Sequence, residues 1–423
     1  MFLNKQKVYS RAFFSAVFFT FSGYYVLLIL LVNLVGKHYS RYMTVPLRIL
    51  ILLLLFSCLQ LLGKKSRLDK PILVAFALFS FFYILRIIIE ILKGSVVYQS
   101  NESFLLYYLS FAVFPFILLL FKKEYAFDLK LYKIAILLSG AMVSVLSVVF
   151  YRQYIGAVGR INLALTRSDQ DYVSPLHFSD TSALSIGVAL FILLTNTTTK
   201  VHKFLLIGVI LLSCIPFFLG AGRSSVLALI VPFLFFMVVQ NNKVKSFYIF
   251  IGLLSFTTLL FFMSELLGSS LVERFMSIED GIESGSSAAV RADIWKFALS
   301  HFFDNPIFGY SLQVPETGHH AHNIIFEILL ATGILGIIPF MYLLIRAFKN
   351  SIAIIKYKPE ASWVVVIFFQ SLIITLFHGT VYGDKGSWFW FSLAFILSMS
   401  NYKQVSVAGG NENKKVSKEL VFT

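Results

Sequence analysis

The sequence GHHAHNIIFEILLATGILG, residues 318–336, passes directly from a histidine-rich polar segment into an apolar one. Within the apolar part, the only charged side chain is Glu327. About 20 apolar residues in a helix cross the ~30 Å hydrocarbon core of a bilayer. The stretch therefore predicts a membrane-spanning helix over residues 323–345, with three imidazoles at one of its ends.

Apolar runs of this kind recur along the whole chain of 423 residues, which is 58% hydrophobic and only 13% charged. Backbone groups find no water inside a bilayer, so spans of this length must be helices. We expect an all-α, polytopic membrane protein of about twelve transmembrane helices. The first run is too long for the apolar core of a signal peptide. The predicted spans are 12–35, 43–63, 71–92, 105–121, 132–151, 180–198, 204–219, 225–241, 247–266, 323–345, 360–378 and 387–400.

The net charge of +15 is explained by membrane topology. With the N-terminus inside, 23 of the 36 Lys and Arg residues fall on the cytoplasmic side, as the positive-inside rule requires. We therefore expect no nucleic-acid partner. The predicted organisation is transmembrane helices one to nine in 1–266, an extracytoplasmic loop with an amphipathic helix in 267–322, helices ten to twelve in 323–400, and a cytoplasmic tail in 401–423.

Arginines gather on the predicted outer side, where the positive-inside rule disfavours them. Arg223 lies in LGAGRSSVLALI, where Gly220 and Gly222 permit a tight turn and Ser224 or Ser225 can cap the next helix. An arginine that only anchors a span at the headgroups is the alternative. Charged groups that topology does not explain are functional candidates. The outer loop 152–179 adds Arg160 and Arg167.

A second outer segment is VRADIWKFALSHFFDNPIFGY, residues 290–310. Its apolar residues recur at helical spacing, which predicts an amphipathic helix. Pro306 ends that helix, because proline cannot continue it and the residue before it is biased out of the helical region. Arg291 then faces either bulk lipid phosphates or a lipid substrate.

The histidines stand at the start of the span. His322 precedes Asn323, a good N-cap, and the partial positive charge of a helix N-terminus disfavours imidazolium. His322 is therefore predicted to be neutral near pH 7 and able to accept a proton. Gly333 and Gly336 lie deeper on nearly the same face and would let a neighbouring helix approach. The pattern describes a rigid helix that carries a base at its outer tip.

Two other site types are less well supported. A metal site would use His319, His320 and His322, but Glu316 is the only carboxylate near them. A transporter would place ionisable groups at the bilayer midplane. The only pair of that kind, Arg86 and Glu90, can satisfy itself on one helix as a structural ion pair. An acidic run comprises Glu273, Glu279, Asp280 and Glu283. It indicates a solvated linker more simply than a cation site.

The segment HNIIFEILLATGILG resembles the signature of the bacterial O-antigen ligase and polymerase superfamily. That signature is a histidine followed by Asn, Ser or Gln, nine free positions, Gly, two free positions, and Gly, Thr or Tyr. Here these positions are His322, Asn323, Gly333 and Gly336. The preceding RADIWKFALSHFFDNPIFGY is similar to the rest of that family region, and the resemblance extends over residues 215–345.

The resemblance implies a GT-C-like glycosyltransferase of the bacterial inner membrane, with its active site on the periplasmic side. Such enzymes transfer a preassembled glycan from undecaprenyl diphosphate, without metal or other cofactor. The family's catalytic residues map onto Arg223, Arg291 and His322. We assign substrate binding to Arg160, Arg167, His319, His320 and Asn323.

The acceptor decides between two members of the superfamily. O-antigen ligases use the lipid A core, in lipopolysaccharide biosynthesis, and this is the function we expect here. Polysaccharide polymerases use another lipid-linked repeat unit and perform the same chemistry. A transporter or flippase is a third, weaker alternative.

Overall fold

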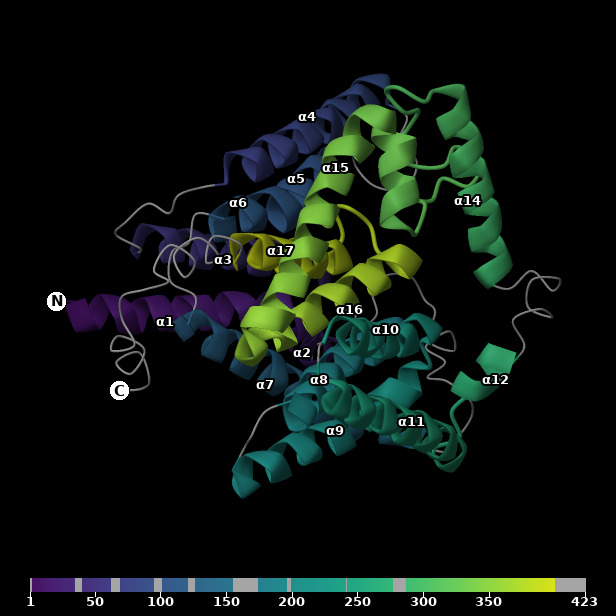
Figure 1. The fold of residues 1–423 in the computed structure, drawn as a ribbon. Coiled ribbons are helices and arrows are strands. Elements are labelled where there is room, and N and C mark those ends of the chain that lie inside the picture. Colours follow the sequence, from purple (N-terminus) through teal and green to yellow (C-terminus); the bar gives the residue numbers. More distant parts are fainter. Residues whose placement is uncertain are drawn as a thin grey trace.

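The computed structural model describes residues 2–34, 40–61, 69–94, 101–120, 126–154, 174–195, 199–240, 242–276 and 287–399. Within these ranges every regular element is a helix, apart from one isolated β-bridge between Val314 and His319 (Figure 1). The all-α fold class is therefore confirmed. The predicted tail 401–423 lies outside the described residues.

The helices follow the predicted order of apolar segments. The first nine are α1 Phe2–Thr20, α2 Ser22–Leu34, α3 Ser40–Leu61, α4 Lys70–Lys93, α5 Asn101–Tyr108, the π-helical turn η2 Leu109–Val113, α6 Phe114–Leu120, α7 Ala126–Tyr151 and the short η3 Arg152–Tyr154. The rest are α8 Pro175–Thr195, α9 Lys200–Gly220, α10 Arg223–Val239, α11 Lys243–Leu266, α12 Leu271–Met276, α14 Ser287–Asp304, α15 Ile324–Tyr357, η5 Pro359–Ala361, α16 Trp363–His378 and α17 Asp384–Ser398.

Seven helices in the described ranges are long and apolar enough to cross a membrane, or eight if the bent pair α1–α2 is one span. That pair was expected to be a single span over 12–35, but it bends by 67° between Thr20 and Ser22. Three further apolar helices are shorter, over 45–58, 104–120 and 223–239. The protein is thus a multi-pass helical membrane protein, and the count of twelve spans stays a prediction.

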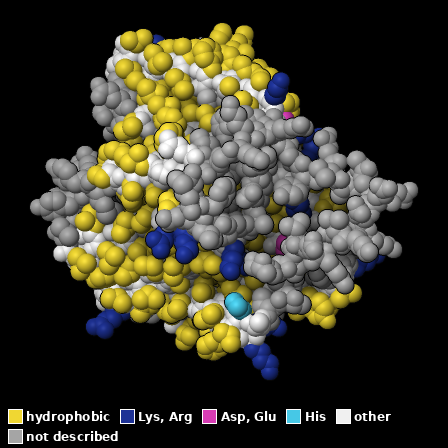
Figure 2. Space-filling model, turned by 90° about the vertical axis from the view of Figure 1, so that its left-hand side faces the viewer, with side chains coloured by type: hydrophobic (Ala, Val, Ile, Leu, Met, Phe, Trp, Pro, Cys, Tyr) yellow, Lys and Arg dark blue, Asp and Glu magenta, His cyan; other side chains and the backbone are white. Residues whose placement is uncertain are grey.

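Apolar side chains cover much of the molecular surface. Figure 2 looks onto the left-hand side of Figure 1, where the coloured side chains are mostly apolar and the charged ones among them are mainly Lys and Arg. Large apolar residues also stand exposed on helices α4, α9 and α11, which suits contact with lipid tails. Examples are Leu78, Phe81, Phe204, Leu211, Phe250 and Phe262.

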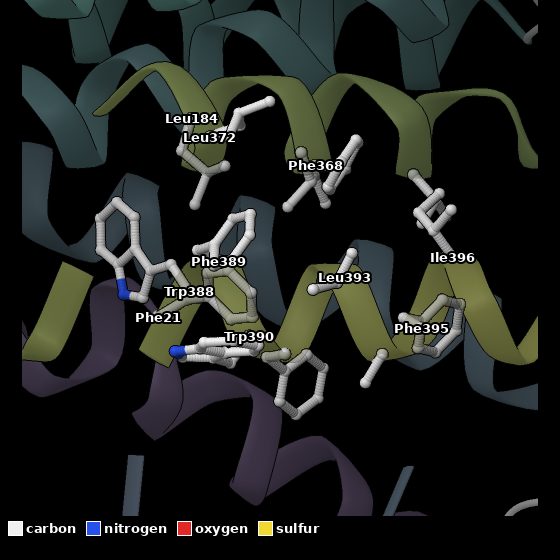
Figure 3. Packing of buried hydrophobic residues seen from close by; sticks show 14 of the residues in the cluster. Phe21, Leu184, Phe368, Leu372, Trp388, Phe389, Trp390, Leu393, Phe395 and Ile396 are labelled. Atoms are coloured by element: carbon white, nitrogen blue, oxygen red, sulfur yellow. The ribbon is translucent and has the colours of Figure 1, made fainter. Parts of the chain in front are cut away.

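Helix α17 lies in the centre of the bundle. All of its residues from Lys385 to Ser398 are buried, and its aromatic rings pack against Phe21 and against Phe368 of α16 (Figure 3). The two indole N–H groups are satisfied, since Trp388 Nε1 donates to Thr20 O at 2.9 Å and Trp390 Nε1 to Val381 O at 3.0 Å. This packing fixes the position of Lys385 at the start of the helix.

Helix α15 is broken at Gly333, whose φ of 59° and ψ of −149° lie outside the helical region. The turn that follows α14 inserts at this break. Tyr310 N donates to Leu330 O at 2.6 Å, and Ile334 N donates to Pro306 O at 2.8 Å. The turn therefore pairs backbone groups that the break leaves without helical partners.

The expectation of an unbroken α15 with glycines receiving a neighbouring helix is wrong. A Cβ on Gly333 would lie 2.5 Å from the carbonyl oxygens of Pro306 and Ile307, so its close neighbour is a turn. At Gly336 the atoms nearest an added Cβ belong to Thr332 of the same helix. The glycine at 333 is needed because its positive φ disfavours any residue with a Cβ.

Arg86 of α4 holds the same junction together. Its guanidinium donates to four carbonyl oxygens at 2.7–2.8 Å, and Glu90 is farther away, 3.7 Å from Nη1. The predicted ion pair with Glu90 is therefore present, but most of the hydrogen bonds of the guanidinium go to backbone carbonyls of other segments. The four acceptors are the carbonyls of Phe308, Gly309, Tyr310 and Ala331.

Candidate functional site

Three predicted residues from distant parts of the sequence come together. Arg223 is the first residue of α10, Arg291 lies on α14, and His322 directly precedes α15. Burial lowers the pKa of Arg291, and nearby Arg223 lowers it further. Arg291 in turn lies close enough to His322 to lower the pKa of its imidazole. The two guanidinium groups and the imidazole thus share one electrostatic environment.

His322 is held in an uncommon conformation at the start of α15. Its φ is 53°, in the left-handed region, and Asn323 Oδ1 accepts from Ile325 N at 2.9 Å and from Phe326 N at 3.3 Å. The predicted N-cap is thereby confirmed. A non-glycine residue in this backbone region is strained and persists where its surroundings fix it.

The charge state of His322 follows from its surroundings. Burial, then Arg291, His319 and His378 in that order, lower its pKa to about 4. The imidazole is therefore neutral near pH 7, as predicted. The prediction attributed this to the helix N-terminus, whereas the largest cause is burial, followed by Arg291. Among the described residues, its buried Nδ1 has no hydrogen-bond partner. This nitrogen is free to accept a proton from a bound hydroxyl group.

Helix α14 packs against the loop that carries the three histidines and holds it in place. The helix ends at Asp304, before the Asn305–Pro306 step, as predicted. Trp295 Nε1 donates to the carbonyl of Ala321 at 2.8 Å, directly beside His322. A small core joins α14 to the loop and to α15, formed by Ile294, Ala298, Val314, Ala321 and Leu330. This core places Arg291 and His322 on a common support.

The other predicted binding residues differ in position. His319 is exposed, and its ring centroid is 6.4 Å from that of His322. The ring of His320 is closer, at 4.0 Å, and burial together with the neighbouring His322 and His319 lowers its pKa to about 3. Arg160 and Arg167 lie outside the described residues, as do Glu279, Asp280 and Glu283 of the acidic run.

The turn before α10 has a different construction from the expected one. The left-handed residue is Ala221, with φ of 44°, and the helix is capped by Gly222 without a side-chain hydrogen bond. The prediction that Ser224 or Ser225 caps the helix is therefore wrong. Gly220 is required for close packing, since a Cβ there would lie 2.4 Å from Pro175 O.

Both serines instead join a buried polar network that sequence reasoning missed. Asp180 of α8 is fully buried, and its Oδ2 lies 2.7 Å from His378 Nε2 and 3.2 Å from Lys385 Nζ. Its Oδ1 accepts from Ser225 Oγ at 2.7 Å. On the other side of the ring, Ser224 Oγ is 3.2 Å from His378 Nδ1. The network joins α8, α10, α16 and α17 beside Arg223.

The sequence did contain a signal for this network. The predicted span 180–198 begins at Asp180, but α8 already begins at Pro175, so the carboxylate lies more than one turn inside an apolar helix. An ionisable residue in that setting is a functional candidate by default. His378 and Lys385 each stand alone in the sequence at the end of a predicted span, so nothing in the sequence relates them to Asp180.

The arrangement suits a reaction at a phosphorylated group. Planar guanidinium groups bind phosphate through paired hydrogen bonds and stay charged. A neutral imidazole beside them can remove a proton from a hydroxyl group. The chemistry favoured is attack of a hydroxyl on a carbon whose leaving group is a phosphate or diphosphate.

The comparison with known families concerns the same region of the chain. Residues 207–341 match the family model described as O-antigen ligase, and this region includes Arg223, Arg291 and His322. No curated protein matches the chain. Residues 207–341 thus form an O-antigen ligase family domain, which supports the O-antigen ligase and polymerase superfamily indicated by the signature around His322.

Proposed function

We propose that this protein is an O-antigen ligase, a glycosyltransferase that moves a preassembled glycan from undecaprenyl diphosphate to the lipid A core. The observation that carries the proposal is the convergence of Arg223 and Arg291 beside neutral His322. The family match supports a ligase or polymerase activity in general. The reaction would take place on the periplasmic side of the bacterial inner membrane.

In the proposed reaction, His322 acts as the general base. An acceptor hydroxyl gives its proton to the free nitrogen of His322 while its oxygen forms a bond to the anomeric carbon of the donor glycan. The bond from that carbon to the diphosphate oxygen breaks, and the electron pair leaves with the diphosphate. Attack opposite the leaving group inverts the anomeric centre.

Arg223 and Arg291 would stabilise the leaving group. Negative charge grows on the diphosphate as the bond breaks. The two guanidinium groups are already in position and would stabilise that charge without rearrangement. Burial and, after it, the like charge of Arg223 lower the pKa of Arg291, and an anion between the two guanidinium groups would relieve that repulsion. We therefore propose a metal-independent reaction in which the arginines supply the positive charge.

The surroundings of the site suit a substrate with a lipid tail. Large apolar side chains stand exposed on α14 and on the turn after it, where an isoprenoid or the membrane surface would contact them. They are Val290, Phe297, Phe303, Ile307 and Phe308. The donor would keep its isoprenoid in the bilayer while its diphosphate reaches the arginines.

The test uses a strain that lacks the gene, complemented with the wild type or with Arg223→Lys or Arg291→Lys. Lysine keeps the charge but loses the planar fork, so both variants should lose most glycan transfer. Exposed Arg152→Lys is the matched control and should complement fully. Near-normal transfer by both site variants would contradict the proposed arginine roles.

The same experiment separates the two acceptors. A lipopolysaccharide gel of the deletion strain should show a core without O-antigen, while lipid-linked polymer accumulates. A core that carries a single repeat unit would instead identify a polymerase. Unchanged lipopolysaccharide in the deletion strain would exclude both.

A further inference from the structure

The two hydrogen bonds that link Ser224, His378 and Asp180 have a fixed donor-to-acceptor direction. The side chain of His378 is only 7% exposed, and both of its ring nitrogens are engaged, Nε2 with Asp180 and Nδ1 with Ser224. Asp180 is ion-paired with Lys385 and is an acceptor only. The proton on His378 therefore stays on Nε2, where it is donated to Asp180, and Nδ1 faces Ser224.

This direction couples the hydroxyl of Ser224 to the charge of His378. When His378 is neutral, its Nδ1 accepts, so the Ser224 hydroxyl must donate to the ring and offers only lone pairs to a ligand. When His378 is protonated, Nδ1–H donates to Ser224 Oγ. The hydroxyl hydrogen is then released and can be donated to a ligand.

The chain ends in the candidate site. Ser224 follows Arg223 in the first turn of α10, and His378 lies close enough to His322 to help lower the pKa of that imidazole. An anion bound at Arg223 favours a positive charge on His378 and needs hydrogen-bond donors. Both demands are met by one added proton on His378.

Charged and titratable groups from several helices surround His378. Asp180 contacts it from α8, where His177 also lies near the ring, and Lys385 of α17 contacts the same carboxylate, while His322 lies near it at the start of α15. The Asp180 carboxylate attracts positive charge on the ring, whereas the Lys385 ammonium group repels it. A diphosphate bound at Arg223 would add negative charge that attracts positive charge on the ring.

We propose that Ser224, His378 and Asp180 form a proton-linked donor for the diphosphate of the glycan donor, which takes up a proton on His378 when the diphosphate binds. The inference rests on the proposed function, because it assumes a diphosphate at Arg223. Ser224 contacts the phosphate, and Asp180 positions His378. The proton comes from solvent and returns to it when the product diphosphate leaves.

The test measures binding of farnesyl diphosphate, a short isoprenyl diphosphate, to the purified full-length protein by calorimetry. Titrations from about pH 6.5 to about pH 8.5, in buffers of different ionisation enthalpy, give the protons taken up. Over most of this range the ligand is nearly fully ionised. The wild type should take up protons, so its affinity should fall as pH rises.

Two variants separate the roles of the chain. His378→Gln keeps a donor toward Asp180 but cannot be charged, so its affinity should be lower and nearly independent of pH. Ser224→Ala removes the donor itself and should weaken binding by roughly 10- to 100-fold. Ser182→Ala is the control, because this buried hydroxyl donates to Phe178 O of its own helix and should change neither property.

The outcomes distinguish the two proposals. Proton uptake by His378→Gln equal to that of the wild type, or unchanged affinity in Ser224→Ala, overturns the proton-linked donor while the ligase proposal stands. Absence of binding to the wild type at any pH, with the protein folded and monodisperse, removes the diphosphate site and the proposed function with it.

Discussion

The backbone of Gly309 lies directly against the backbone of Gly333. A Cβ on Gly333 would stand 2.7 Å from the amide nitrogen of Gly309, and a Cβ on Gly309 would stand 2.6 Å from Leu330 O. Both residues have positive φ, 72° and 59°. Side chains at these two positions would keep the turn after α14 from packing against the break in α15. This contact holds the segment between α14 and α15, which carries His322.

Gly333→Ala should disrupt this contact. The new Cβ would collide with two carbonyl oxygens at 2.5 Å and would force alanine into a left-handed conformation. We expect the free energy of unfolding to fall by at least about 2 kcal/mol, with loss of transfer. The midpoint of thermal unfolding in detergent measures the first effect and glycan on the acceptor the second.

Gly208→Ala is the matched control for this change. It lies in α9, and a Cβ there meets nothing within 4 Å. Alanine favours a helix over glycine by about 1 kcal/mol, so this variant should be at least as stable as the wild type. Equal stability of the 333 and 208 variants would contradict the role of the break.

Arg86→Lys should destabilise the same junction. An ammonium group cannot donate to four carbonyls that are arranged around a planar guanidinium, so some of them lose their donors. We expect a loss of about 3 kcal/mol or more in the free energy of unfolding, measured as above. Arg346→Lys is the control, because Arg346 forms a partly exposed pair with Asp69 and should tolerate lysine. A stable, active Arg86→Lys protein would show that these carbonyls do not require a planar guanidinium group.

His322→Ala should remove the proposed base. General-base catalysis contributes about 10²–10⁴-fold, so transfer should fall by that factor at matched expression. His319→Ala, at an exposed neighbouring ring, should keep most of the activity. The measurement is the rate of glycan transfer by purified protein, and a wild-type rate in the His322 variant would exclude the assignment.

The pH dependence of transfer should report the neighbours of His322. Its pKa is lowered to about 4, so the base stays neutral, and the rate at saturating donor should hold until the pH falls toward that value. Lys296→Gln, which removes an exposed charge of α14, should leave this profile unchanged.

Arg291→Gln should move the acid limb of this profile. Removing the cation raises the pKa of His322 back toward its ordinary value, so the residual activity should begin to fall at a higher pH than in the wild type. The rate of transfer measured from about pH 4.5 to about pH 8 at saturating donor tests this. Identical acid limbs in both proteins would mean that His322 is not the group that titrates.

Chelation should leave the reaction intact. Arg223 and Arg291 are proposed to meet the charge of the diphosphate, so transfer by purified protein should continue in excess EDTA. Activity lost in EDTA and restored by Mg²⁺ or Mn²⁺ would instead point to a cation at the carboxylates of the acidic run.

The sequence by itself determined the helical architecture and several local features. Long apolar runs must be helices in a bilayer, so the all-α class follows from composition. The stop at Pro306 and the cap at Asn323 depend only on neighbouring residues, and both were predicted correctly. The signature around His322 indicated the superfamily for the same reason, because its positions lie within one segment.

Tertiary structure alone decided how distant groups meet. Arg86 and its four carbonyl acceptors, and Asp180 with His378 and Lys385, come from segments that periodicity cannot relate. The break at Gly333 was likewise read as a packing site, because a glycine in an apolar run looks the same whether a helix or a turn lies against it. Which buried polar group finds which partner is set by the packing of whole helices, and only that packing makes it favourable to bury those groups.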